Sequence, residues 1–147
     1  MLPPVYKTEI ISLYGYEGRH VDSGAKHFVI PIDNFNPNDV NELGKKIRFS
    51  TIFKPHGVNV NFVSRIDKNT LNVLTYEKGI ESMVLSCGSG SVASAFHVSH
   101  INNIESPINI INPGGQLMLE FDKDWQDVWL SGPAHLSFQS NWHLKIK

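Results

Sequence analysis

The sequence is poor in features that whole classes of protein need. Its 147 residues include one cysteine, Cys87, which excludes an intrachain disulfide and a cysteine-rich zinc site. Its 13 Lys and Arg against 14 Asp and Glu give a formal net charge of -1, so no basic excess exists to bind nucleic acid. Residues 1–10 carry prolines and charges instead of an apolar signal segment. We therefore expect a cytoplasmic protein with no nucleic-acid or membrane partner.

Charged side chains are missing altogether from residues 82–104. Within this run, residues 92–103 are apolar or small around most of a helix circumference, but serines, histidines and asparagines make the run too polar to cross a bilayer. A helix without a charged face is normally enclosed by other elements. The sequence therefore predicts a central helix buried inside the domain, with Cys87 at its entrance.

The other segments predict short strands and one outer helix. Apolar residues at helical spacing predict a surface helix over 39–48 with Asn38 as its N-cap. We expect an α+β fold for residues 1–147 as a single domain: a curved antiparallel β-sheet wrapped around the buried central helix, plus the outer helix. Apolar and alternating patterns between turn residues predict strands at 9–13, 20–32, 58–62, 71–76, 108–111, 117–121, 128–130 and 136–140.

The segment that carries chemistry is Ser86-Cys87-Gly88-Ser89-Gly90-Ser91. The first turn of a helix has backbone N–H groups without partners and a partial positive charge, which favours a thiolate and can hold an anion. Glycines let a carboxylate approach those N–H groups, and we expect the pKa of the cysteine to be lowered. Free cysteines are often inert and buried, so local sequence alone leaves that reading equally open.

Three other kinds of site fit the sequence less well. A Walker phosphate loop needs Lys and then Ser or Thr after its last glycine, whereas Gly90 is followed by Ser91 and Val92. A cysteine-protease pair needs a partnering histidine, and no spacing selects one of the seven present. His97 and His100 share a helical face but lack further zinc ligands. We therefore expect no metal.

Several motifs in the same order along the chain resemble the diaminopimelate epimerase family. The resemblance covers nearly the whole chain but only the C-terminal half of the usual two-lobe enzyme. Its motifs are VDSG at 21–24 with HFV at 27–29, GVNVNF at 57–62, YEKGIE at 76–81, LSCGSG at 85–90, PGG at 113–115 and SGPA at 131–134.

The resemblance implies epimerisation or racemisation at an amino-acid α-carbon, in lysine and meso-diaminopimelate biosynthesis, without pyridoxal phosphate or metal. Two cysteines face the α-carbon from opposite sides, one as thiolate base and one as thiol acid. Cys87 would be one of them, with His27 beside the catalytic pair and Glu77 ordering the site. The implied substrate-binding residues are Asn59, Lys78, Gly88 and Ser89.

The chain departs from the family pattern in ways that concern specificity and completeness. Ala25-Lys26 replaces Asn-Pro, Met83-Val84 replaces Glu-Thr, and Lys78 replaces an arginine whose fork suits a carboxylate. The partner cysteine belongs to the absent first lobe. A separate first-lobe chain or a second copy of this chain would have to complete the site. The alternative is a non-catalytic lobe that binds a carboxylate or a partner.

Overall fold

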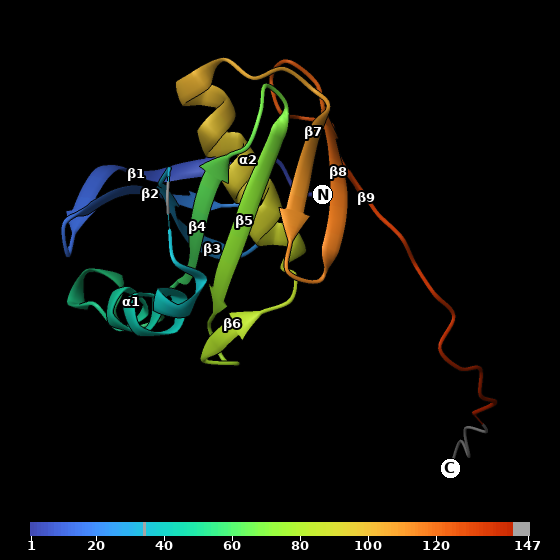
Figure 1. The fold of residues 1–147 in the computed structure, drawn as a ribbon, viewed down its shortest axis with the longest axis horizontal. Coiled ribbons are helices and arrows are strands. Elements are labelled where there is room, and N and C mark those ends of the chain that lie inside the picture. Colours follow the sequence, from blue (N-terminus) through green and yellow to red (C-terminus); the bar gives the residue numbers. More distant parts are fainter. Residues whose placement is uncertain (34, 143–147) are drawn as a thin grey trace, which may run out of the picture.

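The computed structural model describes residues 1–33 and 35–142. One strongly curved sheet wraps around helix α2 (Gly88–Asn102), and helix α1 (Val40–Arg48) lies against the outer face of the same sheet (Figure 1). This confirms the predicted α+β architecture with a central and an outer helix. Short 3-10 turns, η1 (Pro37–Asp39) and η2 (Thr51–Phe53), flank α1.

The strands follow the order β1-β2-β3-β4-β5-β7-β8-β9, and β6 pairs with β5 off this path. Most neighbours are antiparallel, as predicted, but β3–β4 and β5–β7 are parallel pairs. Each parallel pair is joined through a helix, α1 or α2, because a parallel connection must cross back over the sheet. The strands are β1 (Val5–Leu13), β2 (Tyr16–Asp22), β3 (Lys26–Pro31), β4 (Asn59–Arg65), β5 (Thr70–Glu77), β6 (Ser82–Val84), β7 (Ile108–Asn112), β8 (Gly115–Phe121) and β9 (Val128–Ser131).

Helix α2 is enclosed as its lack of charge predicts. Every residue from Gly90 to Ser99 is buried, and Val92, Ala95 and Phe96 belong to the core between this helix and the concave face of the sheet. The helix ends at Asn103, whose left-handed backbone (φ 52°) closes the last turn. No helix within the described part of the chain is both long and apolar enough to cross a bilayer.

The convex face of the sheet carries a second core under α1. Residues of β3 and β4 alternate between the two faces, so Phe28 and Phe62 pack with Val40 and Ile47 of α1, whereas Val29 and Val63 face the α2 core. Strands covered on both faces are buried along their length. This explains why the first five residues of β4, including its two asparagines, are buried.

Three predicted boundaries were wrong for local reasons. The expected strand 20–32 is two antiparallel strands, β2 and β3, separated by a turn in which Gly24 has φ +95°. The amide oxygen of Asn36 caps η1 by accepting from the Asn38 N–H, and α1 starts only at Val40, so Asn38 is not its N-cap. The first strand begins at Val5, earlier than expected.

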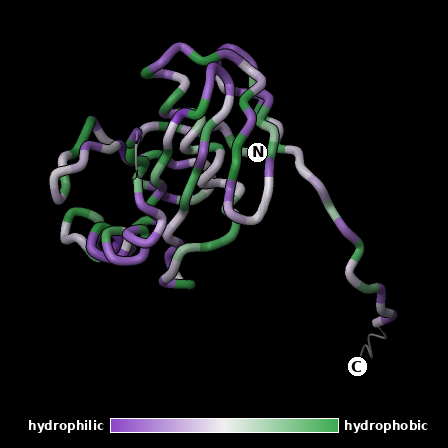
Figure 2. Tube along the Cα trace, viewed as in Figure 1, coloured by the Kyte–Doolittle hydropathy of each residue, from purple (hydrophilic) through white to green (hydrophobic). Residues whose placement is uncertain are grey.

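The strand predicted over 136–140 is absent from the sheet. Residues 132–142 run away from the body of the fold as an extended, exposed segment in which hydrophobic and hydrophilic positions alternate (Figure 2). Leu136 and Phe138 are 86% and 80% exposed. The alternation typical of a strand is present, but none of the strands in the described residues pairs with it.

Gly44 lets α1 lie close to the sheet. A Cβ at this position would lie 2.5 Å from the Cβ of Tyr76, a fully buried side chain of β5. We expect Gly44→Ala to lower the free energy of unfolding by about 1–3 kcal/mol, because overpacking outweighs the gain in helix propensity. Urea denaturation checks this. Lys45→Ala, on the exposed side of α1, is the matched control, and an equal or raised stability of Gly44→Ala would contradict close packing here.

Candidate functional site

The candidate site lies at the N-terminus of α2. Cys87 is the N-cap residue, with an extended backbone (φ -137°, ψ 107°), and its carbonyl accepts the first helical bond from the Ser91 N–H at 2.9 Å. Gly90 has to be small: a Cβ there would lie 2.4 Å from Asn61 Nδ2 and 3.2 Å from Cys87 Sγ. The thiol is therefore held at the tip of the helix, as the sequence predicts.

A chain of buried polar side chains leads away from this thiol across three neighbouring strands. Cys87 Sγ lies 3.6 Å from Ser89 Oγ, which lies 3.0 Å from His27 Nε2 on β3. His27 Nδ1 lies 2.7 Å from Asn61 Oδ1 on β4, and Asn61 Nδ2 donates to Thr75 Oγ1 on β5 at 2.7 Å. The last three residues are buried. Each member thus has a polar partner in an apolar interior, which avoids the cost of a buried unsatisfied group.

His27 is neutral at physiological pH. Burial lowers its pKa to about 4, although the hydrogen bond to Asn61 Oδ1 and the charge of Asp22 act in the opposite direction. A neutral imidazole carries hydrogen on one nitrogen only. Since Asn61 presents its carbonyl oxygen to Nδ1, the hydrogen is on Nδ1 and the Nε2 lone pair faces Ser89.

The expected low pKa of Cys87 is not found in this chain. Burial raises the pKa of the half-buried thiol, and the neighbouring Glu77 carboxylate raises it further, while the Ser89 side chain and the backbone N–H of Gly90 act in the opposite direction. The sequence argument counted the helix N-terminus but not the desolvation of the sulfur or the nearby negative charge. The resting state of Cys87 is therefore the protonated thiol.

The other predicted residues gather at the same end of the sheet. Asn59 is paired with His27 across β3 and β4, and its Oδ1 accepts from the Lys78 N–H at 2.8 Å. Glu77 ends β5, close enough to act on the sulfur of Cys87, and the Lys78 side chain is exposed. The structure thus brings together the predicted residues Cys87, His27, Glu77, Asn59, Lys78, Gly88 and Ser89.

Three supporting residues were not identified from the sequence as part of the site. Asn61 lies between apolar residues of β4, Thr75 lies in the mostly apolar strand β5, and Ser23 donates from its hydroxyl to the Ser89 carbonyl at 2.8 Å. A polar residue inside a buried strand is the signal that points to Asn61 and Thr75. Of the departures from the family pattern, Met83 packs against the α1 core.

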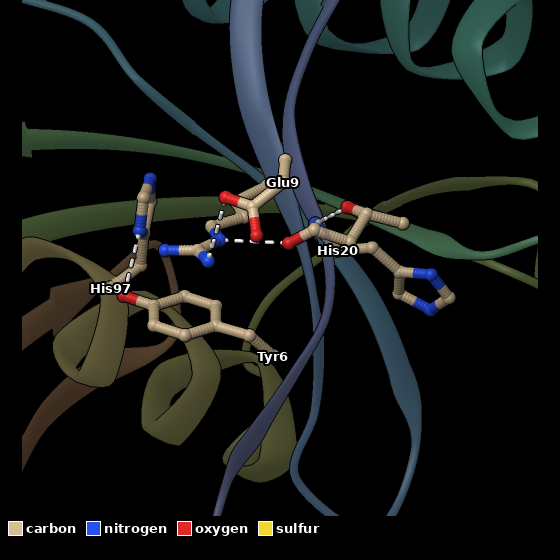
Figure 3. A network of polar contacts seen from close by, with 6 residues as sticks. Tyr6, Glu9, His20 and His97 are labelled. Carbon is tan, nitrogen blue, oxygen red and sulfur yellow. Dashed lines mark hydrogen bonds and ion pairs between the residues drawn. The ribbon is translucent and has the colours of Figure 1, made fainter.

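His97 and His100 belong to a different polar cluster. Residue 97 is about 15 Å further along the helix than Cys87, at 1.5 Å per residue. The Tyr6 hydroxyl lies 3.2 Å from His97 Nδ1 (Figure 3). The guanidinium of Arg19 lies over the Tyr6 ring, 3.5 Å from its centroid. His97 and Tyr6 are therefore packing partners that join α2 to β1.

The arrangement of a curved sheet around one helix recurs in solved structures of the PhzF family. The phenazine biosynthesis protein of Bacillus anthracis superposes with a TM-score of 0.53 at 11% identity, over 86% of this chain and 38% of that one. The protein of Enterococcus faecalis superposes with a TM-score of 0.51 at 13% identity, over 67% and 35%. These superpositions show that the chain shares its fold with part of each of these proteins.

The sequence comparisons are more specific. The family model described as diaminopimelate epimerase matches residues 19–136, and the chain belongs to this family. It is 36% identical over 125 residues to the diaminopimelate epimerase of Aquifex aeolicus and 39% identical over 127 residues to that of Methanocella arvoryzae. These matches cover 83% and 86% of this chain but 44% of each relative. The matched part of the chain therefore spans less than half the length of each of these relatives.

The low pKa of His27 predicts acid sensitivity that depends on this residue. The pKa is about 4 in the folded protein and near 6.5 when unfolded, so below pH 6.5 the unfolded state binds more protons. The contribution of the neutral, buried His27 to the free energy of unfolding is therefore complete above pH 6.5 and is lost as the pH falls towards 4. Between pH 7 and pH 4.5, His27→Gln should therefore lose about 2 kcal/mol less stability than the original chain. Urea denaturation at both pH values measures this, and an identical loss in both proteins would contradict a buried neutral His27.

Proposed function

We propose that this chain is one half of an enzyme that epimerises an amino acid at its α-carbon, with Cys87 as one of two acid/base groups. The observation that carries the proposal is the position of Cys87 in a member of this family, at the tip of an enclosed helix and in contact with Ser89 and Glu77. A side chain that acts as a general acid or base must lie within hydrogen-bond reach of the proton that it transfers.

The first turn of α2 supports binding of the substrate carboxylate. The N–H groups that open a helix have no intrahelical partners and lie at the positive end of its dipole. Gly88 and Ser89 follow Cys87 directly in this turn. A carboxylate held there would place the α-carbon beside the sulfur, and the N–H groups would stabilise the negative charge that builds on the carboxylate as the α-proton leaves.

The neighbouring turn supports binding of the remaining substrate groups. Glu77 offers a carboxylate to the α-ammonium group, and Lys78 offers a cation to a distal carboxylate. Asn59 holds the backbone N–H of Lys78 and so fixes the turn between β5 and β6. Lys78 has the same charge as the arginine of the family pattern, but it cannot form the two parallel hydrogen bonds of a guanidinium to a carboxylate. The distal group of the substrate is therefore bound less selectively.

Inversion requires a second group on the opposite side of the α-carbon. A base there takes the α-proton, the electrons of the C–H bond pass into the carboxylate, and the Cys87 thiol gives its proton to the other face. Reversal regenerates the first configuration with the roles exchanged. Because the sequence has one cysteine, the second thiol comes from a separate first-lobe chain or, in a symmetric arrangement, from a second copy of this chain.

We expect Cys87→Ser to lower the incorporation of deuterium at the substrate α-carbon at least 100-fold, the usual contribution of a positioned acid or base. The assay incubates the full chain in heavy water with diaminopimelate and a panel of amino acids, with and without a chain carrying the first half of the M. arvoryzae relative. Exchange that survives Cys87→Ser would contradict the proposal. The rival function, a lobe that only binds carboxylates or a partner, is favoured by the raised pKa of the thiol and predicts amino-acid binding without exchange.

The extended segment 132–142 supports association with a first-lobe chain. It leaves β9 next to the candidate site, since a Cβ on Gly88 would lie 3.2 Å from Leu130 Cδ2. Leu136, Phe138 and Trp142 are exposed by 80% or more and alternate with polar residues. A strand with one apolar face and free backbone groups pairs readily with the sheet edge of another chain.

Disrupting the apolar face of this segment should weaken the association. We expect Leu136→Asp combined with Phe138→Asp to reduce binding of the first-lobe chain at least 10-fold, because charges replace buried apolar area. Gln139→Asp, on the alternate face, is the matched control. Binding is measured by light scattering and by titration calorimetry. Equal binding of all three proteins would contradict a role for the segment.

A further inference from the structure

The turn between β5 and β6, residues 78–81, joins the candidate site to the outer helix. On the side of the site, Glu77 ends β5 and acts on the sulfur of Cys87, and Lys78 begins the turn. On the other side lies α1, which packs against β5 and β6 on the convex face of the sheet. The positions of Glu77 and Lys78 therefore depend on how this short turn is held.

The carboxylate of Glu81 holds this turn together. Its Oε1 accepts from the Gly79 N–H at 3.0 Å and from Arg48 Nη2 at 3.2 Å, and its Oε2 accepts from the Tyr76 hydroxyl at 3.3 Å. The Glu81 N–H donates to the Glu77 carbonyl at 2.8 Å. Glu81 is thus bonded to both ends of the turn and to α1.

These bonds fix an unfavourable backbone conformation at Glu81. Its φ is +59°, in the left-handed region that residues other than glycine seldom adopt. Such a conformation persists only where the surrounding contacts determine it. Burial acts to raise the pKa of Glu81, but the Gly79 N–H, the Arg48 charge and the Tyr76 hydroxyl outweigh burial and lower the pKa. Glu81 is therefore an anion at neutral pH and accepts from all three donors.

Arg48 connects the turn to α1. It is the last residue of this helix, and its side chain is only 14% exposed. The helix makes two further contacts with the strands that flank the turn: Asn41 Oδ1 accepts from the Met83 N–H at 2.7 Å, and Gly44 lies against Tyr76. The outer helix therefore supports the turn on the face of the sheet opposite to α2.

We propose that Arg48 and Glu81 are positioning residues, through which α1 holds the turn so that the Glu77 carboxylate stays beside Cys87 and Lys78 stays at the candidate site. The part that concerns Glu77 and Cys87 is a property of this chain alone. The part that concerns Lys78 and a substrate rests on the proposed function. Arg48 and Glu81 act through the residues that the turn carries, without touching the substrate.

The thiol of Cys87 reports where Glu77 lies. Burial is the largest influence that raises the pKa of this thiol, and the charge and side-chain contact of Glu77 raise it further. The other groups that act on the sulfur, the Ser89 side chain and the Gly90 N–H, belong to α2 and lower the pKa. A turn that releases Glu77 therefore lowers the pKa of the thiol without moving the groups on α2.

The test measures how fast iodoacetamide alkylates Cys87 in the full chain from pH 6 to pH 10. We expect Arg48→Met, which keeps the apolar part of the side chain, and Glu81→Gln, which removes the charge, to move the midpoint of the rate profile to lower pH. The rate at pH 8 should rise about 3-fold, because more of the sulfur is then thiolate. Lys46→Met is the matched control, since it removes an exposed ion pair of α1 with Glu42 and should leave the midpoint unchanged.

The same substitutions in a Glu77→Gln background separate positioning from a general loosening of the fold. Without the Glu77 charge, Arg48→Met and Glu81→Gln should leave the midpoint unchanged, and a double-mutant cycle isolates this coupling. An unchanged midpoint in the original chain, a shift to higher pH, or an equal shift in both backgrounds would overturn the proposal. Far-ultraviolet circular dichroism checks folding, and either variant decides the outcome if the other does not fold.

Activity separates this inference from the proposed function. In the assembled enzyme, Arg48→Met should raise the KM for the substrate more than it lowers the kcat of α-proton exchange, because Glu77 and Lys78 bind substrate groups in the proposed function. An unchanged KM would overturn the part of the inference that concerns Lys78. The expected midpoint shift in an assembly that shows no α-proton exchange would reject the proposed function but not the positioning of Glu77.

Discussion

The constraint on which the structure depends is the enclosure of an uncharged helix. Helix α2 has no polar stripe for water, so the sheet must curve around it, and its core residues pack on every side. Enclosure leaves only the two helix ends accessible. The thiol of Cys87 lies at the end where unpaired N–H groups and the positive dipole end concentrate, and the chemistry follows from that position.

Enclosure also explains why the site needs a buried polar chain. Strands β3, β4 and β5 are covered by α1 on one face and α2 on the other, so any polar side chain at the tip of α2 is cut off from water. His27, Asn61 and Thr75 satisfy one another there instead. The same desolvation raises the pKa of Cys87 and lowers that of His27. Cys87 therefore keeps its proton as a thiol, and His27 stays neutral.

The sequence predicted the features that depend on patterns within one segment. The charge-free run predicted α2 and the position of Cys87, and the family motifs predicted which residues would meet there. Features set by competing or long-range effects were missed: the pKa of Cys87 depends on burial that no local pattern reveals, and the site role of Thr75 depends on the register between strands. Residues 136–140 have the pattern of a strand, but a strand also needs a partner.

The central claim is that Cys87 lies beside a carboxylate-binding helix tip. The most direct measurement compares alkylation of the full chain by iodoacetate, which carries a carboxylate, and by neutral iodoacetamide, relative to an unstructured cysteine peptide. The account predicts that the ratio of the two rates is at least 10-fold higher for Cys87 than for the peptide and falls when a free amino acid is added. A ratio equal to that of the peptide, insensitive to added amino acid, would contradict it.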